Sequence, residues 1–191
     1  MNITKIKPSA IIITLCAAAI LLLSAATGAA HKKQGMLEAG IQHMLAQRVA
    51  VMEVEALIRS RQPYTKDAER RGYSEIIVDA ANEHRVPHLR VARVAIAESS
   101  LNHRAVGDGG KSIGVMQVST RWWIGTVPFI ESERDLRDAT KNIRAGAWIL
   151  AHYAELCGDE EEAVLACWNG GEQPNEQAKA YARRVAGGSG T

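Results

Sequence analysis

Residues 91–118 read VARVAIAESSLNHRAVGDGGKSIGVMQV. An apolar run with helical spacing ends at Glu98, a glycine-rich loop follows, and a second segment starts at Gly114. Burying an ionised carboxylate costs free energy, so the pKa of an acid at the end of a buried helix rises. A carboxylic acid that stays protonated near neutral pH can donate a proton to a leaving group. Taken alone, Glu98 is better interpreted as an ordinary surface glutamate, and the rest of the chain decides whether it is more than that.

The apolar residues of the chain recur mainly at helical spacing. We expect a helix over residues 35–60, a charged linker over 66–71, and a helix that starts at Ser74 and ends before Pro87. Further helices are predicted over residues 88–99, 112–123, 138–155, 159–168 and 176–185. No segment has the alternating pattern of a long strand, so the predicted fold class is all-α, that is, mainly helical.

The N-terminal segment has the pattern of a signal peptide or a membrane anchor. Lys5 and Lys7 precede a run of apolar residues over 11–23, and small residues follow up to Ala30. The uncharged stretch over residues 8–30 is also about long enough to span a bilayer. We therefore expect an exported or periplasmic protein, anchored in the inner membrane through residues 1–30 if they are not cleaved. The predicted organisation is this segment at 1–30, a helical stalk or linker at 31–72, and a globular domain at 73–191.

Charge and cysteine content restrict the function classes. The chain has 23 Lys and Arg and 21 Asp and Glu, and residues 1–30 hold two of the lysines and no acid, so the remainder is formally neutral. A nucleic-acid partner is not expected, because such proteins carry a basic surface. Cys157 and Cys167 could form a disulfide after export, or they could be two buried thiols. His84 and His88 are separated by Pro87, so we expect no metal site there and no cofactor elsewhere.

Five separated motifs then occur in order along residues 73–186. They are Glu98-Ser99, Gly114-Val115-Met116-Gln117, residues 142–147 (NIRAGA), Trp168-Asn169-Gly170-Gly171 and residues 181–185 (YARRV). Their order and spacing resemble the soluble lytic transglycosylase (SLT) domain, which is related to goose-type lysozyme. The resemblance implies a lysozyme-like fold with a sugar-binding groove. It also implies cleavage of the bond between N-acetylmuramic acid and N-acetylglucosamine in the glycan strands of peptidoglycan.

The resemblance further implies roles for individual residues. Glu98 matches the single catalytic acid, which protonates the glycosidic oxygen and then removes a proton from the muramic acid 6-hydroxyl to close a 1,6-anhydro ring. The expected substrate-binding residues are Ser99, Met116, Gln117, Trp168, Asn169 and Tyr181. Among these, Tyr181 matches a tyrosine that hydrogen-bonds the acid.

The sequence also departs from the family pattern at Val115, Trp168 and Gly170, where Leu, Tyr and Ala are usual. The loop before Gly114 is longer, and its Asp108 could hold a water molecule for lysozyme-type hydrolysis of the same bond. A glycan-binding module without activity is a further alternative, and a membrane-tethered helical spacer is another that rests only on residues 35–60. Possible partners include secretion, conjugation or phage lysis machinery, where SLT-like domains behind an export segment occur.

Overall fold

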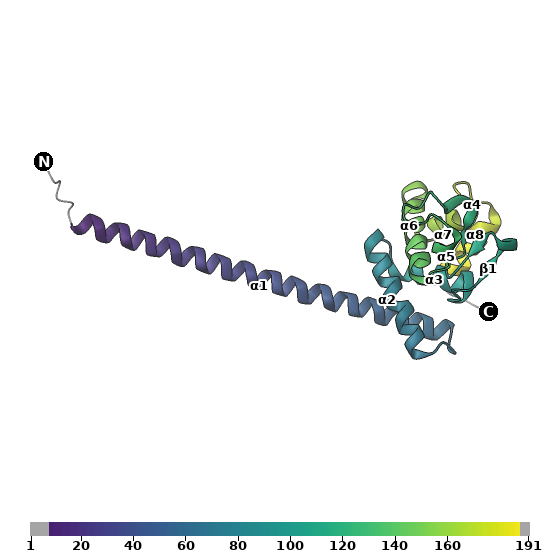
Figure 1. The fold of residues 1–191 in the computed structure, drawn as a ribbon, viewed down its shortest axis with the longest axis horizontal. Helices are drawn as coiled ribbons and strands as arrows, with labels where there is room; N and C mark the ends of the chain where they lie inside the picture. Colours follow the sequence, from purple (N-terminus) through teal and green to yellow (C-terminus); the bar gives the residue numbers. More distant parts are fainter. Residues whose placement is uncertain (1–7, 188–191) are drawn as a thin grey trace. The chain divides into compact units, whose positions relative to one another are not determined.

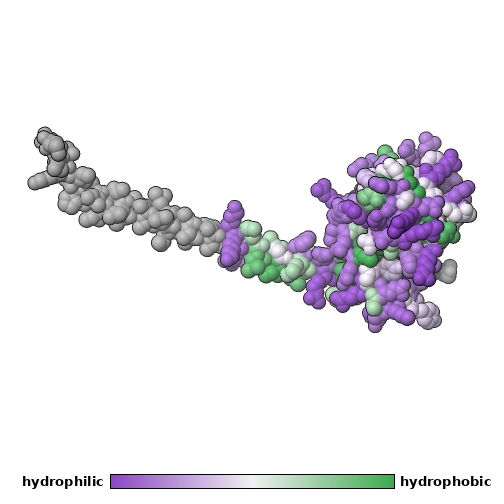
Figure 2. Space-filling model, in the orientation of Figure 1, coloured by the Kyte–Doolittle hydropathy of each residue, from purple (hydrophilic) through white to green (hydrophobic). Residues whose placement is uncertain are grey.

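The computed structural model describes residues 8–187, and it describes side chains from residue 32 onward. The chain divides into two units, Met1–Ala46 and Gln47–Thr191. The first unit contains most of helix α1 (Pro8–Arg61), and its described side chains are exposed. Figure 2 shows apolar surface on this helix, and Met36, Leu37 and Met44 are among the exposed residues there. The predicted signal or anchor segment, residues 1–30, lies outside the residues whose side chains are described.

The second unit is a helical domain (Figure 1). Its buried apolar side chains form a single core. It contains the end of α1 and helices α2 (Asp67–His84), α3 (His88–Ser99), α4 (Thr120–Trp123), α5 (Glu133–Leu136), α6 (Ala139–Cys157), α7 (Glu161–Gly170) and α8 (Glu176–Gly187). This content confirms the predicted all-α, lysozyme-like fold. Within the described residues, no helix is long and apolar enough to cross a membrane.

Helix α6 is the central element of the domain and packs against α2, α3, α5 and α7. Its apolar stripe includes Ile143, Ala147 and Leu150, all of which are fully buried. Asp138 caps its first turn, because the side chain accepts a hydrogen bond from Lys141 N at 2.8 Å. A Cβ atom at Gly146 would lie 2.6 Å from two atoms of the Met116 side chain. The glycine therefore allows the close contact between this helix and Met116.

Two predicted boundaries are wrong. Residues 66–71 were expected to be a linker, but α2 begins at Asp67. Ser74 was expected to cap that helix, yet it lies within the helix, is fully buried, and donates a hydrogen bond to Arg70 O at 2.9 Å. Charged residues here form the exposed first turns of an amphipathic helix, and Arg70 itself is buried against Thr65 O.

The segment between α3 and α4 also differs from the prediction. Ser112 was expected to cap a helix, but it belongs to a small antiparallel sheet in the order β1-β2-β3. The strands are β1 (Val106–Gly107), β2 (Ser112–Ile113) and β3 (Val118–Ser119). Each has only two residues, which is too short to produce an alternating sequence pattern.

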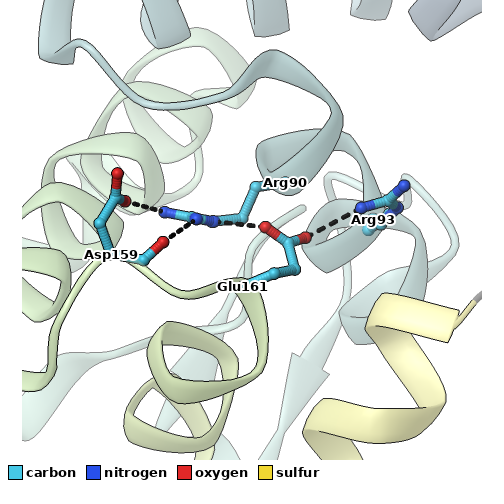
Figure 3. Close-up of polar contacts among 4 residues, drawn as sticks. All are labelled: Arg90, Arg93, Asp159 and Glu161. Atoms are coloured by element: carbon cyan, nitrogen blue, oxygen red, sulfur yellow. Dashed lines mark hydrogen bonds and ion pairs between the residues drawn. The ribbon is translucent and has the colours of Figure 1, made fainter.

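Helix α7 is tied to its neighbours by a disulfide and by ion pairs. Cys157 at the end of α6 is bonded to Cys167 in α7. Figure 3 shows Arg90 of α3 between two acids, with bonds of 2.9 Å to Asp159 Oδ1 and 2.7 Å to Glu161 Oε2. Arg90 also donates to Asp159 O, and Arg93 pairs with the other oxygen of Glu161. Because only 3% of the Arg90 side chain is exposed, this is a shielded connection between α3 and the start of α7.

Candidate active site

Glu98 lies in the last turn of α3, at the edge of the core. The preceding turns are fixed by buried side chains, including Val91, Val94 and Ala95. Ser100 ends the helix in a left-handed conformation with φ of 54°. The Glu98 side chain is half-buried and lines a cleft of about 800 Å³. The cleft is also lined by Asp108, Gln117, Trp122, Trp123, Trp168 and Asn169.

Two side chains hold the Glu98 carboxyl group. Tyr181 of α8 donates its hydroxyl proton to Oε1 at 2.6 Å, and Trp168 Nε1 of α7 donates to the same oxygen at 2.9 Å. Among the described residues, no hydrogen bond reaches Oε2, and the only fully buried polar side-chain atom without a partner is His84 Nε2. Oε2 is therefore open to solvent, so one oxygen is fixed and the other is available to a ligand.

The surroundings of Glu98 favour its protonated form. Burial raises the pKa of this carboxyl group, and the negative charge of Asp108 raises it further. The hydrogen bonds from Tyr181 and Trp168 lower the pKa, as does the nearby Arg184, but burial is the largest effect and the pKa stays above its ordinary value. A larger fraction of Glu98 is consequently protonated near neutral pH than for an exposed glutamate, as a general acid requires.

Tyr181 keeps its hydroxyl proton at neutral pH and remains a hydrogen-bond donor there. Burial raises its pKa far above the ordinary tyrosine value, and the adjacent Glu98 carboxylate raises it further. Its hydroxyl can therefore donate to Glu98 whether or not the carboxyl group is ionised. The resemblance implied this hydrogen bond, and the structure contains it. The second donor to Glu98 is Trp168, which stands where the resemblance led us to expect a tyrosine.

Gln117 reaches the cleft from the turn between β2 and β3. Its backbone is left-handed, with φ of 45°, and its Nε2 donates to Gly114 O at 3.0 Å. A Cβ atom at Gly107 would lie 2.3 Å from Gln117 Oε1, so any larger residue there would displace the amide from this position.

Asn142 of α6 supports the same β2–β3 turn through hydrogen bonds to backbone atoms. It is fully buried, its Oδ1 accepts from Met116 N at 2.8 Å, and its Nδ2 donates to Ile113 O and Leu136 O at 2.9 Å each. Gly114 packs directly on it, with φ of 83°. Asn142 is thus a structural support of the site. Its place in the NIRAGA motif was the only sequence signal for it.

The structure does not bring every predicted residue to the cleft. Met116 is fully buried on Gly146 and is not among the residues that line the cleft. Ser99 likewise does not line it, and its hydroxyl donates to Val115 O at 2.7 Å, which connects α3 to the β2–β3 turn. Both residues lie beneath the surface that a ligand would touch.

Asp108 is a second acid on the cleft. It precedes the left-handed Gly109 in a short 3-10 turn, Asp108–Gly110, and accepts a hydrogen bond from Ser112 Oγ at 2.6 Å. Asp108 and Glu98 line the same cleft, and the negative charge of Asp108 raises the pKa of the Glu98 carboxyl group. The glycine-rich loop thus places a carboxylate where it could orient a water molecule.

Aromatic residues form one side of the cleft. Trp122 is 63% exposed, and Trp123 packs edge-on against Trp148, His152 and Tyr153. His152 and Tyr153 also line the cleft, and sequence reasoning missed them. Ile149 also lines the cleft, and His152 and Tyr153 follow it by three and four residues. This spacing could have revealed that one face of α6 borders the site. Phe129, in the segment between α4 and α5, is packed under Arg144 and is not a cleft residue.

Within the described residues, no group of three or more His, Cys, Asp or Glu side chains could hold a metal ion. His88 Nε2 lies 2.8 Å from Glu53 Oε2, while His84 stacks on Phe129, so the two histidines have separate environments.

Comparison with known families connects this geometry to a class of proteins. No curated protein matches the sequence. The family model described as "Transglycosylase SLT domain" matches residues 75–187. The match includes Glu98, Gln117, Trp168 and Tyr181, that is, the acid with both of its hydrogen-bond donors and the glutamine across the cleft. It covers more than half of the chain, and the chain therefore belongs to the SLT transglycosylase domain family.

Proposed function

We propose that this protein is a lytic transglycosylase that uses Glu98 as its only acid and base. The family indicates cleavage of peptidoglycan glycan strands in general. The specific reaction proposed here breaks the β-1,4 bond between N-acetylmuramic acid and N-acetylglucosamine and forms 1,6-anhydromuramic acid. The observation that carries the proposal is a half-buried carboxyl group on the cleft, with a raised pKa and one open oxygen.

The reaction has two proton transfers at one carboxyl group. Glu98 first donates its proton to the glycosidic oxygen as the bond to the muramic acid C1 breaks. The substrate's own N-acetyl group stabilises the positive charge at C1. The resulting carboxylate then accepts the proton of the C6 hydroxyl, whose oxygen bonds to C1, so that Glu98 is protonated again and no water is consumed. This route differs from the usual scheme of two carboxyl groups.

The hydrogen bonds around Glu98 suit this cycle. Tyr181 and Trp168 donate to Oε1 and stabilise the carboxylate that forms midway. We assign Gln117, Trp168 and Asn169 to the glycan, because they line the cleft together with Glu98. Ser99 and Met116 would act on the site indirectly, through the position of the β2–β3 turn.

Hydrolysis is the second candidate reaction, and Asp108 is the observation that favours it. A carboxylate on the opposite loop could activate water for attack at C1, which would give a lysozyme-type product. The two reactions differ by one molecule of water in the product.

The test is a digest of purified peptidoglycan by the full-length protein in mild detergent, analysed by mass spectrometry. Muropeptides one water lighter than hydrolysed ones are expected from the wild type and from Asp108→Asn. Their absence in a folded Glu98→Gln variant would assign the acid. Full-mass products that disappear in Asp108→Asn would establish hydrolysis instead. Binding of glycan without any product would point to a glycan-binding module.

We also propose that the protein is exported to the periplasm, with residues 1–30 as its signal or anchor. The Lys5 and Lys7 charges before the apolar run support this, as does the Cys157–Cys167 disulfide, because disulfides persist in oxidising compartments. Cell fractionation and N-terminal sequencing test it. A mature chain starting at His31 would indicate cleavage, whereas an intact chain that resists alkaline extraction would indicate an anchor. An association with secretion, conjugation or lysis machinery would be detected by cross-linking in cells.

A further inference from the structure

The domain has a second cavity that the proposed reaction does not use. Its volume is about 580 Å³, and it lies between the end of α2 and one face of α6. The residues that carry the argument are Glu83, His84, Trp148, His152 and Glu155. Trp148, His152 and Glu155 are spaced by four and three residues, so they lie on one face of α6. A volume of this size is within the range of pockets that bind small ligands.

His84 lines this cavity, and its Nε2 lies 3.9 Å from Glu83 Oε2, which is beyond hydrogen-bond distance. Its Nε2 is the only fully buried polar side-chain atom without a hydrogen-bond partner in the part of the chain that the structure describes. Such atoms are rare, because leaving a buried polar group unpaired costs about 1–3 kcal/mol. Burial lowers the pKa of His84. The neutral ring can then either donate or accept a hydrogen bond at this nitrogen.

The surroundings of His84 are rigid. Its ring stacks on Phe129 with an angle of 14° between the planes, and the guanidinium group of Arg144 covers Phe129 at 4.2 Å from the ring centre. Arg144 holds both oxygens of Glu83, with Nε to Oε2 at 2.6 Å. This carboxylate is therefore fixed in place while 41% of its side chain remains exposed, and each oxygen can accept another hydrogen bond.

An aromatic group connects this cavity to the catalytic cleft. His152 lines both spaces, and Trp148 stacks on it with 5.6 Å between ring centres and 9° between planes. Among the described residues, no hydrogen bond uses Trp148 Nε1, which leaves an indole donor for a ligand at the second cavity. The two spaces are thus neighbours on either side of one imidazole ring.

From these contacts we propose that the second cavity is an accessory saccharide site that binds an N-acetylhexosamine of a glycan. A sugar hydroxyl both donates and accepts hydrogen bonds, which matches His84 Nε2 and the fixed Glu83 carboxylate. The indole N–H of Trp148 matches an N-acetyl carbonyl or a hydroxyl oxygen. That the glycan is peptidoglycan rests on the proposed function. The site would hold a segment of glycan beside the strand that lies in the cleft.

The experiment uses the full-length Glu98→Gln protein, so that no substrate is cleaved. The chain has four tryptophans, and their indole N–H signals in ¹⁵N-edited NMR spectra are assigned by substitution with Phe. The probe is the β-1,4-linked disaccharide of N-acetylglucosamine. We expect both the Trp168 and the Trp148 signals to shift, each with its own midpoint, because they report on different sites.

His84→Phe is the decisive variant, because a phenyl ring can retain the stacking on Phe129 while it removes Nε2. It should weaken binding at Trp148 by about fivefold, the effect of one hydrogen bond, and leave the Trp168 midpoint unchanged. His43→Phe, an exposed change in the first unit, is the matched control and should alter neither midpoint. Thermal unfolding checks that both variants are folded.

Three results would overturn the proposal. The Trp148 signal could stay fixed while that of Trp168 saturates, or its midpoint could be the same in a folded His84→Phe variant. It could also respond to a free peptide stem and not to the sugar, which would make the cavity a peptide site. None of these depends on catalysis, so a failure of the peptidoglycan digest would overturn the proposed function and leave this inference standing. A β-1,4-linked hexasaccharide of N-acetylglucosamine then distinguishes two arrangements. One molecule bound per chain indicates a single strand across both sites, and two molecules per chain indicate separate strands.

Discussion

The burial of the Glu98 carboxyl group predicts how this residue affects the stability of the domain. Burial raises the pKa of this carboxyl group in the folded protein, so its ionised form is less favourable there than in the unfolded chain. The cost is absent below the ordinary pKa of 4.5, grows as the pH rises, and is complete above the raised pKa.

Glu98→Gln should therefore increase the free energy of unfolding at neutral pH and change it little at pH values well below 4.5. The amide oxygen can still accept hydrogen bonds from Tyr181 and Trp168, so the contacts are retained. Urea unfolding across this pH range measures the difference. Glu162→Gln, on the exposed side of α7, is the matched control and should give a flat difference. A stabilisation that is the same at every pH would contradict the assignment to the buried charge.

Tyr181→Phe removes one of the two hydrogen bonds to Glu98 Oε1 and tests its effect on the pKa of this acid. The hydrogen bond from Tyr181 lowers the pKa of Glu98, so its loss should raise that pKa further. Because the proposed reaction begins with protonated Glu98, the alkaline limb of the pH–rate profile should move to higher pH, while the maximal rate falls as the carboxyl group loses its orientation. Initial rates of glycan cleavage against pH provide the measurement. Trp168→Phe should shift the limb in the same direction, and a shift to lower pH in either variant would refute this account.

At the scale of elements, the helices were largely predictable and the segment beside the acid was not. The bounds of α3 were predicted correctly, and those of α6 nearly so, because each has a strong apolar stripe. The first turns of α2 and the small sheet were missed. Residues 67–71 are mostly exposed, so they show no apolar pattern that would indicate a helix. The two-residue strands depend on long-range contacts with Asn142 rather than on local preference.

The candidate site was likewise predictable only in part. Glu98, Gln117, Trp168, Asn169 and Tyr181 were found from motif order. The structure places the first four on the cleft and Tyr181 behind them, hydrogen-bonded to Glu98. His152 and Asn142 were not assigned to the site, because a histidine on a helix face and a buried asparagine have no distinctive local pattern. Their importance follows only from what packs against them.

Asn142→Leu tests whether one side chain supports the β2–β3 turn. The change keeps the approximate volume but removes the buried hydrogen bonds that Asn142 makes with Met116 N, Ile113 O and Leu136 O. At about 1 kcal/mol or more for each group, the free energy of unfolding should fall by about 3 kcal/mol or more. Asn175→Ala is the comparison, because it removes a single hydrogen bond at the exposed start of α8 and should cost about 1 kcal/mol. Equal losses in the two variants would show that the turn does not depend on Asn142.

At the scale of the whole molecule, α7 has two long-range connections that bring Trp168 to Glu98. The disulfide joins α7 to the end of α6, and the Arg90 cluster joins its start to α3 (Figure 3). The disulfide closes a loop with a sequence separation of 10. Its loss should lower the free energy of unfolding by roughly 2–3 kcal/mol.

A Cys157→Ser, Cys167→Ser double variant measures this loss in urea, and reduction of the wild type by dithiothreitol should reproduce it. The double variant should not respond to the reductant, which serves as the internal control. If the wild type kept its full stability after verified reduction, the covalent bond would contribute nothing beyond the packing of α6 on α7.

If the protein is exported as proposed, the position of the disulfide sets an order of steps in its maturation. Cys167 is directly followed by Trp168, whose indole binds the Glu98 carboxyl group. A newly made chain with free thiols has this tryptophan held by weak forces alone, and the covalent restraint arises only after an oxidant has acted. A cell that synthesises a wall-degrading enzyme in a reducing interior would in this way delay the final setting of its acid until the chain has reached the compartment where its substrate lies.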